Sequence, residues 1–256
     1  MKPNSSRVKK WKRWLDKSVV EVGRLRTFIE VRRDFMAVVD QSPIKNRKDA
    51  FWTFIGFAMV DELVIRAVRI CERQGRGEKR VHSLRALLEE CAEYYGYFTR
   101  KRFVGRVHPP KEENDDLDTE GPHPVSARYE FDTRNYVFDS VVGAGKSGLS
   151  KGEIDVDIAR LDAAIDELQK FRNKFIAHND FRRGTRKAPS LSKIPDSVEV
   201  ISQITRKYYQ LITRNDIALG SYIFHTDITQ LFDQAWILSC AILTYGHKKP
   251  VGLSCI

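Results

Sequence analysis

Apolar residues recur every three or four positions over most of the chain, which is the spacing of amphipathic α-helices. The pattern predicts a first helix over residues 6–39, with Gly23 as a point where it could break. A second helix is predicted over 49–75 and a third over 83–100. The stretch 51–60 is apolar almost all round, which is typical of a central helix buried on every side.

The middle of the chain interrupts this pattern. Residues 103–128 combine prolines and glycines with an acidic run over 112–118, which predicts a long loop. The acidic run either covers a cationic groove, where it would compete with RNA, or is a solvated insertion. A short helix or strand is predicted over 129–142, followed by a glycine-rich turn over 143–148.

Helical signals return after the turn. Ser150 and Glu153 have the spacing of a capping box, in which each side chain binds the other residue's backbone N–H. The helix that they begin is predicted to run to about His178. Two further helices are predicted over 196–219 and 226–245, each followed by a glycine.

The fold class follows from these elements. No segment alternates convincingly as a strand does, and no internal repeat is visible. We therefore expect an all-α helical bundle that forms one domain over residues 1–256, with an irregular insertion over about 103–150. The longest apolar runs, 51–60 and 236–243, are too short to cross a bilayer, so no membrane span is predicted.

Composition adds a candidate partner class. The 256 residues carry a formal net charge of +10. A positive field of that size favours RNA, DNA or an anionic membrane surface, although a solvated basic protein also fits. Trp11 and Trp14 lie in the basic opening turns of the first helix, so a membrane or RNA contact or a solvated helix face is expected there. The four cysteines form no C-x-x-C pair, which favours reduced thiols, a cytoplasmic location and no bound metal or cofactor.

Two features have competing interpretations. Residues 140–147 resemble a phosphate-binding P-loop, but Ser140 stands where that motif needs glycine, so a glycine linker explains them better. Asp61 lies on an apolar face of the second helix, and a carboxylate there needs a partner. It either orients the functional residues described next or pairs with a nearby arginine.

The most informative stretch is Phe171-Arg-Asn-Lys-Phe-Ile-Ala-His-Asn-Asp180. Helical spacing places Arg172 in line with the apolar stripe before it, which consists of Ile158, Leu161, Ile165 and Leu168. Burying an unpaired arginine costs on the order of several kcal/mol, so Arg172 needs a carboxylate or an anionic ligand. An ion pair inside the bundle, with His178 interacting with the helix dipole, remains the alternative to a functional site.

The string Arg172-Asn173-x-x-x-x-His178 resembles the R-x(4–6)-H motif of the HEPN superfamily, and its abortive-infection branch in particular. The resemblance implies a helical bundle that pairs about a two-fold axis, and a metal-independent endoribonuclease with Arg172, Asn173 and His178 as catalytic residues. It also allows a non-catalytic module that binds a nucleotide, RNA or a protein. A third alternative is a helical interaction protein in which Arg172 is only an ion-pair partner.

Further expectations follow from the neighbouring residues. The RNA-binding candidates are Lys174, Arg182, Arg183 and Arg186. A second basic–aromatic cluster consists of Arg100, Lys101, Arg102 and Arg106 with Phe98 and Phe103, where aromatic rings could stack on bases or the cations could form a basic helix end. Phe171 and Phe175 suit a homodimer contact through the Arg172–His178 face. The resemblance also implies a toxin or antiphage effector, with an antitoxin or regulatory protein as a further partner.

Overall fold

The computed structural model describes residues 3–41, 50–72, 83–105, 124–177, 193–215 and 217. Helices account for 87% of these residues, and none of these residues forms a strand, so the predicted all-α fold class is confirmed. None of the helices in this part of the chain has the length and hydrophobicity needed to cross a membrane.

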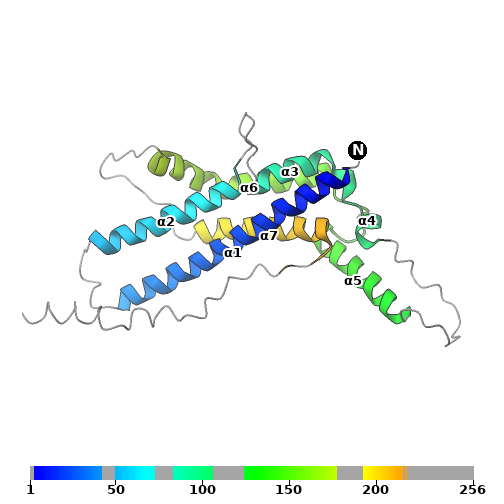
Figure 1. The fold of residues 1–256 in the computed structure, drawn as a ribbon, viewed down its shortest axis with the longest axis horizontal. Coiled ribbons are helices and arrows are strands. Elements are labelled where there is room, and N and C mark those ends of the chain that lie inside the picture. Colours follow the sequence, from blue (N-terminus) through cyan, green and yellow to red (C-terminus); the bar gives the residue numbers. More distant parts are fainter. Residues whose placement is uncertain are drawn as a thin grey trace, which may run out of the picture.

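The helices form an elongated bundle (Figure 1). In chain order they are α1 (Ser5–Gln41), α2 (Ala50–Ile70), α3 (Leu84–Glu93), α4 (Arg100–Val104), α5 (Pro124–Val142), α6 (Lys151–Phe171) and α7 (Lys193–Thr213). A 3₁₀ turn at Tyr95–Tyr97 follows α3, and a π-helical turn at Arg172–Ala177 follows α6. α1 packs along α7, α3 along α6, and α5 projects from the end of the bundle where α4 lies (Figure 1).

α1 continues through Gly23 without a break. Trp11 and Trp14, for which a surface contact was one expectation, are 0% and 4% exposed. Trp11 Nε1 donates to Glu90 Oε2 over 3.0 Å, and Lys10 Nζ lies 2.5 Å from the other oxygen of Glu90. The tryptophans therefore belong to the core between α1 and α3, and they are not a membrane or RNA contact.

The third helix is shorter than predicted because aromatic side chains turn the chain inward. α3 begins after the N-cap Ser83, whose side chain accepts from Ala86 N–H, but it ends at Glu93. Beyond it, Tyr97 packs edge-on against Trp11 at a centroid distance of 5.5 Å, and Phe98 stacks on Trp11 at 6.1 Å. Burying these rings is worth more than one further helical turn.

The prediction that residues 51–60 are buried on every side is wrong for the part whose side chains are described. Phe54 is 66% exposed and Phe57 is 37% exposed, whereas Val60 is 4% exposed. The buried face of α2 begins at Val60 and continues through Leu63, Val64, Ala67 and Val68. Asp61 is half-buried at this boundary.

The region between α3 and α6 is more helical than the sequence pattern predicts. The segment predicted as a short helix or strand over 129–142 is helix α5, and it begins earlier, at Pro124. A proline is tolerated in the first turn of a helix because the N–H that it lacks has no partner there, so Pro124 is compatible with this start. Most of the predicted loop, residues 106–123, lies outside the described residues.

The core contains two cysteines beside its large aliphatic side chains. Cys71 follows α2 and Cys91 lies on α3, and they are 1% and 0% exposed. Both are free thiols, and burial raises the pKa of each well above its ordinary value. Such thiols stay protonated and pack as small apolar side chains.

Candidate functional site

Arg172 begins the π-helical turn that continues α6. The buried stripe of α6 consists of Ile154, Asp157, Leu161, Ile165, Leu168 and Phe171. Phe171, and not Arg172, thus completes the stripe, and Arg172 is half-buried beside it. A π turn is wider than an α turn and is frequently found at functional sites. It changes the direction of the side chains from Arg172 onward, so extrapolation of α-helical spacing no longer holds there.

Three nitrogens of the Arg172 guanidinium have partners. Nη1 donates to Glu72 Oε1 over 3.0 Å, which joins the end of α6 to the residue just beyond α2. Nε and Nη2 both donate to Asn173 Oδ1, over 3.2 and 3.0 Å. The pair is accessible to solvent, with the Arg172 side chain 23% exposed and that of Glu72 37% exposed.

The carboxylate that contacts Arg172 is one that sequence analysis did not single out. Glu72 and Arg172 are separated by 100 positions, so no local spacing could connect them. Asp61 was the predicted orienting acid. It lies nine residues before the end of α2 at Ile70, about 13 Å along the helix axis at about 1.5 Å per residue. Its orienting role stays a prediction, while Glu72 is the observed partner.

The residues after Arg172 differ in accessibility. Asn173 and Lys174 are exposed, and Lys174 Nζ lies 5.1 Å from the centre of the Phe175 ring. Phe171 and Phe175 are in contact at 5.2 Å between ring centroids, but Phe171 is only 4% exposed. Of the two rings expected at a dimer contact, Phe175 is thus the accessible one, and Phe171 belongs to the core.

The other predicted site residues lie outside the described residues. These are His178, Arg182, Arg183 and Arg186. The structure therefore positions Arg172, Asn173 and Lys174 of the motif, and the place of the imidazole stays a prediction. In the described part of the chain, no three histidine, cysteine, aspartate or glutamate side chains are grouped as a metal site would need.

The second basic–aromatic cluster is not built for base stacking. Phe98 and Phe103 are 2% and 3% exposed, so neither ring can receive a base. Arg100 lies with its guanidinium carbon 4.8 Å from the centre of the Phe138 ring, and it pairs with Asp139. This hydrogen bond lowers the pKa of Asp139. Arg100 therefore ties α4 to α5.

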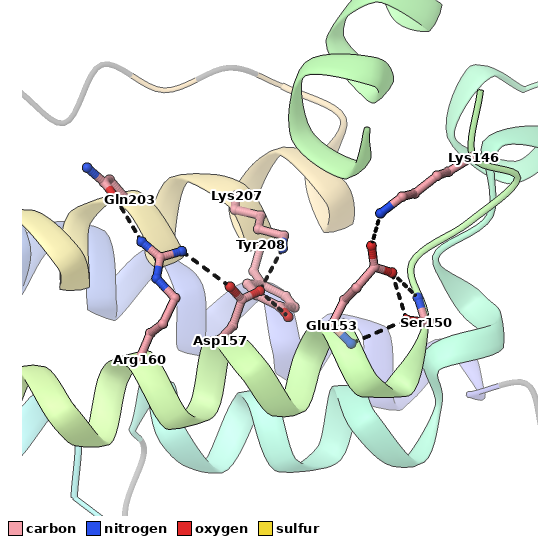
Figure 2. Close-up of polar contacts among 8 residues, drawn as sticks. All are labelled: Lys146, Ser150, Glu153, Asp157, Arg160, Gln203, Lys207 and Tyr208. Carbon is pink, nitrogen blue, oxygen red and sulfur yellow. Dashed lines mark hydrogen bonds and ion pairs between the residues drawn. The ribbon is translucent and has the colours of Figure 1, made fainter. Parts of the chain in front are cut away.

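Sequence analysis missed a polar network around Asp157, which interrupts the apolar stripe of α6 (Figure 2). The carboxylate is 3% exposed, and its Oδ2 accepts from Lys207 Nζ over 2.6 Å and from the Tyr208 hydroxyl over 3.1 Å. Burial and the neighbouring carboxylate raise the pKa of Tyr208, so its hydroxyl remains a donor. Arg160 lies 3.6 Å from Asp157 Oδ1 and donates to Gln203 over 3.2 Å.

This network borders a groove of about 400 Å³ between α5, α6 and α7. The groove is lined by Ser140, Val141, Asp157, Arg160, Gln203, Ile204, Arg206, Lys207 and Gln210. Asp157 lies four positions before Leu161, so helical spacing would have identified it as an acid on the buried stripe. Because two cations and a hydroxyl satisfy Asp157, the network connects α6 with α7 and supports a structural role.

The stretch that resembles a P-loop is a linker, as the sequence analysis favoured. Gly143 and Gly145 have φ values of 115° and 74°, which only glycine adopts readily. Lys146 donates to Glu153 of the capping box, whose two hydrogen bonds with Ser150 are both present (Figure 2). The lysine thus stabilises the beginning of α6, and no strand precedes it among the described residues.

Comparisons with protein-family models, curated proteins and solved structures find no match to the chain.

Proposed function

We propose that the protein is a metal-independent endoribonuclease whose site is built on Arg172, Asn173 and His178. The observation that carries the proposal is the position of the Arg172 guanidinium at the surface. Among the described residues, its Nε–Nη2 edge contacts only the neutral amide oxygen of its neighbour Asn173. That edge binds two oxygens of a phosphate in bidentate contacts, and rotation of the exposed Asn173 side chain would release it.

The chemistry requires no group beyond these side chains and the RNA itself. A base removes the proton of the 2′-hydroxyl, the 2′-oxygen forms a bond to phosphorus, and the bond from phosphorus to the 5′-oxygen breaks. An acid then protonates the leaving 5′-oxygen. Histidine titrates near neutral pH and serves in either role. Arg172 would stabilise the charge that develops on the non-bridging oxygens. The products are a 2′,3′-cyclic phosphate and a 5′-hydroxyl.

Two chains would supply both proton-transfer groups. One chain has one histidine in the motif, whereas a homodimer across the Arg172–His178 face would bring together two. Phe175 beside the motif is partly buried, and with Ile176 it leaves some apolar surface for that contact. Exposed Lys174, with Arg182, Arg183 and Arg186, would bind the RNA backbone without sequence preference.

The experiment measures cleavage of mixed single-stranded RNA in EDTA, with products separated by electrophoresis and their ends identified. Arg172→Ala and His178→Ala are compared with the parent and with Lys170→Ala, which removes an exposed cation from the preceding turn. We expect the cleavage rate of the two motif variants to fall at least about 100-fold, which is the order of magnitude for the loss of one transition-state contact. Lys170→Ala should retain the rate of the parent.

Loss of folding would not explain such a result. The Arg172–Glu72 pair is partly exposed, and pairs of this kind contribute about 1 kcal/mol or less. Arg172→Lys adds a sharper test because it keeps the charge but loses the planar fork. Full activity of Arg172→Lys, or of His178→Ala, would contradict the proposed mechanism.

A second candidate function is a non-catalytic module that binds RNA, a nucleotide or a protein through the same face. The observation that favours it is that three guanidinium nitrogens already have partners within the chain. It predicts RNA retention on a filter or in an anisotropy assay without any cleaved product. If neither binding nor cleavage occurs, Arg172 is an ion-pair partner only.

The biological setting that we propose rests on the HEPN resemblance. In this setting the protein acts in the cytoplasm as a toxin or an antiphage effector, and an antitoxin or another regulatory protein restrains it.

A further inference from the structure

Three arginines from three helices converge where α4 ends. Arg102 lies on α4, Arg134 on α5, and Arg214 directly follows α7. Arg134 and Arg214 lie beside Gly105, which follows α4 with a φ of 85°. We call these three side chains the arginine cluster. Figure 1 shows α4, α5 and the last turn of α7 at the same end of the molecule.

The distances around Gly105 define the cluster. A Cβ atom on Gly105 would lie 3.5 Å from Arg134 Nη1 and 3.9 Å from Arg214 Nη1. The distance between these two nitrogens is therefore at most the sum of those two distances. Arg134 Nη1 also donates to the Val104 carbonyl over 3.2 Å, which anchors its guanidinium at the end of α4. The absence of a side chain on Gly105 lets both guanidinium groups approach its backbone.

Arg102 is fixed by an aromatic ring. Its guanidinium carbon lies 3.0 Å from the centre of the Tyr97 ring, and Nη1 donates to the Tyr97 carbonyl over 3.4 Å. Burial, followed by the positive charge of Arg214, lowers the pKa of Arg102 to about 10. Arg102 and Arg214 are therefore close enough for their positive charges to repel each other.

The cluster has more positive than negative charge. Arg134 pairs with Glu130, and Arg102 donates to the carbonyl and the hydroxyl of Tyr97. Among the described residues no carboxylate forms an ion pair with Arg102 or Arg214. Arg214 has a φ of 66°, a left-handed conformation that residues with a Cβ rarely adopt. Its N–H donates to Gln210 O over 2.8 Å, so the end of α7 holds this conformation and presents the arginine. Helices commonly end in a left-handed residue, so this conformation is the ordinary end of α7.

We infer that the arginine cluster binds a phosphate group. Guanidinium groups from several directions match the tetrahedral arrangement of phosphate oxygens, and a doubly charged anion would offset two unpaired cations. The phosphate belongs either to an RNA backbone or to a small phosphorylated compound. In the first case the inference extends the proposed function, and in the second it stands without it.

The inferred site is distinct from the Arg172 motif. Thr99, which precedes α4, forms a backbone bridge with Gly148, just before α6 begins. Arg172 follows the other end of α6, and 21 helical residues span about 31 Å. An RNA bound at both places would therefore contact this protein over a distance on the order of that length, and the two sites can be tested separately.

The test uses Arg214→Gly, which removes the guanidinium and also suits the left-handed backbone, so the variant should fold at least as well as the parent. Lys101→Ala is the matched control, because it removes one positive charge from the exposed face of the same region. Both changes are made in the His178→Ala background and assayed in EDTA, so that the result does not depend on cleavage. Thermal melts confirm that each variant is folded.

Two probes distinguish the sources of phosphate. Inorganic phosphate is titrated at constant ionic strength, and a fluorescent single-stranded RNA is titrated by anisotropy at several salt concentrations. We expect Arg214→Gly to weaken phosphate binding about 10-fold or more, and Lys101→Ala to leave it within about 2-fold, since a charge-assisted bidentate contact is lost only in the first.

The RNA arm then assigns the ligand. If the phosphate comes from RNA, Arg214→Gly also weakens RNA binding and reduces the slope of log K against log salt by about 1. If RNA binding is unchanged while phosphate binding weakens, the site takes a small phosphorylated compound. Equal affinities of Arg214→Gly and Lys101→Ala for both probes, or no binding of either probe by the parent, would overturn the inference.

Discussion

The buried carboxylate of Asp157 occupies a position where an apolar side chain would continue the stripe of α6. Transferring a charge from water to the protein interior costs several kcal/mol in order of magnitude, and only close opposite charge and hydrogen bonds offset that cost. Lys207 and the Tyr208 hydroxyl supply both from α7. The arrangement therefore fixes how α6 and α7 align, since a shift of either helix would leave the carboxylate without its partners.

Asp157→Asn is expected to lower the free energy of unfolding by roughly 2 kcal/mol, because Lys207 keeps a partly buried charge without its counterion. Arg160→Gln is the control, since the Arg160 side chain is 50% exposed and its loss should cost less than about 1 kcal/mol. Denaturant unfolding with linear extrapolation measures both values. Equal costs for the two variants would show that Asp157 has no special role in stability.

Glu153 gives stability a dependence on pH. The hydrogen bond from Lys146, then the backbone N–H of Ser150, lower the pKa of Glu153 from 4.5 to about 2. A lowered pKa stabilises the folded state at pH values above 4.5, and the contribution is lost as the pH falls towards 2. Because the carboxylate is accessible to solvent, we expect about 1 kcal/mol and not the full value of the shift.

The matching experiment compares Glu153→Gln with the parent across this pH range. The difference in unfolding free energy should be about 1 kcal/mol near neutral pH and should shrink between pH 4.5 and about 2. Glu167→Gln, on the exposed face of the same helix, should show no such change. A difference between Glu153→Gln and the parent that stays constant with pH would contradict the assignment.

At the scale of elements, periodicity predicted the existence of most helices but not where they end. The capping box at Ser150 was found because its partners are three residues apart, and local chemistry alone determines it. The predicted helical course towards His178 holds as far as Ala177, but the change to a wider turn at Arg172 was not predicted, because apolar spacing does not reveal it. The partner Glu72 could not be predicted either, since it approaches Arg172 only after α2 and α6 have packed.

Two glycines allow the effects of helix propensity and of steric contact on stability to be measured separately. Gly56 lies within α2, and an added Cβ would meet nothing within 4 Å, so Gly56→Ala should stabilise the protein by about 0.5–1 kcal/mol. A Cβ on Gly148 would lie 2.9 Å from the backbone oxygen of Phe98, so Gly148→Ala should destabilise it by about 1–3 kcal/mol. Thermal and chemical unfolding of both variants would reveal the opposite signs. Destabilisation by Gly56→Ala would contradict the placement of that residue in an open part of α2.

For the whole molecule, the net charge of +10 acts together with the placement of the cations. Arg172 and the arginine cluster lie towards opposite ends of α6. Arg26, Arg66 and Arg172 are each paired with an acid from another part of the bundle, whereas Arg102 and Arg214 have no carboxylate partner among the described residues. The two proposed contacts with a polyanion are therefore at separate places on the molecule. Long RNA should consequently bind with a steeper salt dependence than fragments too short to reach both places.

The proposed homodimer can be tested by mixing subunits. If each active site needs the histidines of both chains, an excess of inactive His178→Ala chain mixed with the parent should form heterodimers that keep only one of them. RNA cleavage should then fall below that of the same amount of parent chain alone, after the chains have been allowed to exchange. Sedimentation at the same concentrations establishes the assembly state. Undiminished cleavage in demonstrated heterodimers, or full activity of a monomeric parent, would refute the shared site.

The two cysteines enclosed by the bundle give the molecule a built-in reporter of its own opening. Cys71 and Cys91 carry protonated thiols that no reagent reaches while the helices remain packed. With Cys240 and Cys255 replaced by serine, the rate at which an alkylating reagent modifies the protein would follow how often its interior is transiently uncovered. Adding RNA or inorganic phosphate should slow that reaction if either binds the closed bundle preferentially, so occupancy could be detected without observing catalysis.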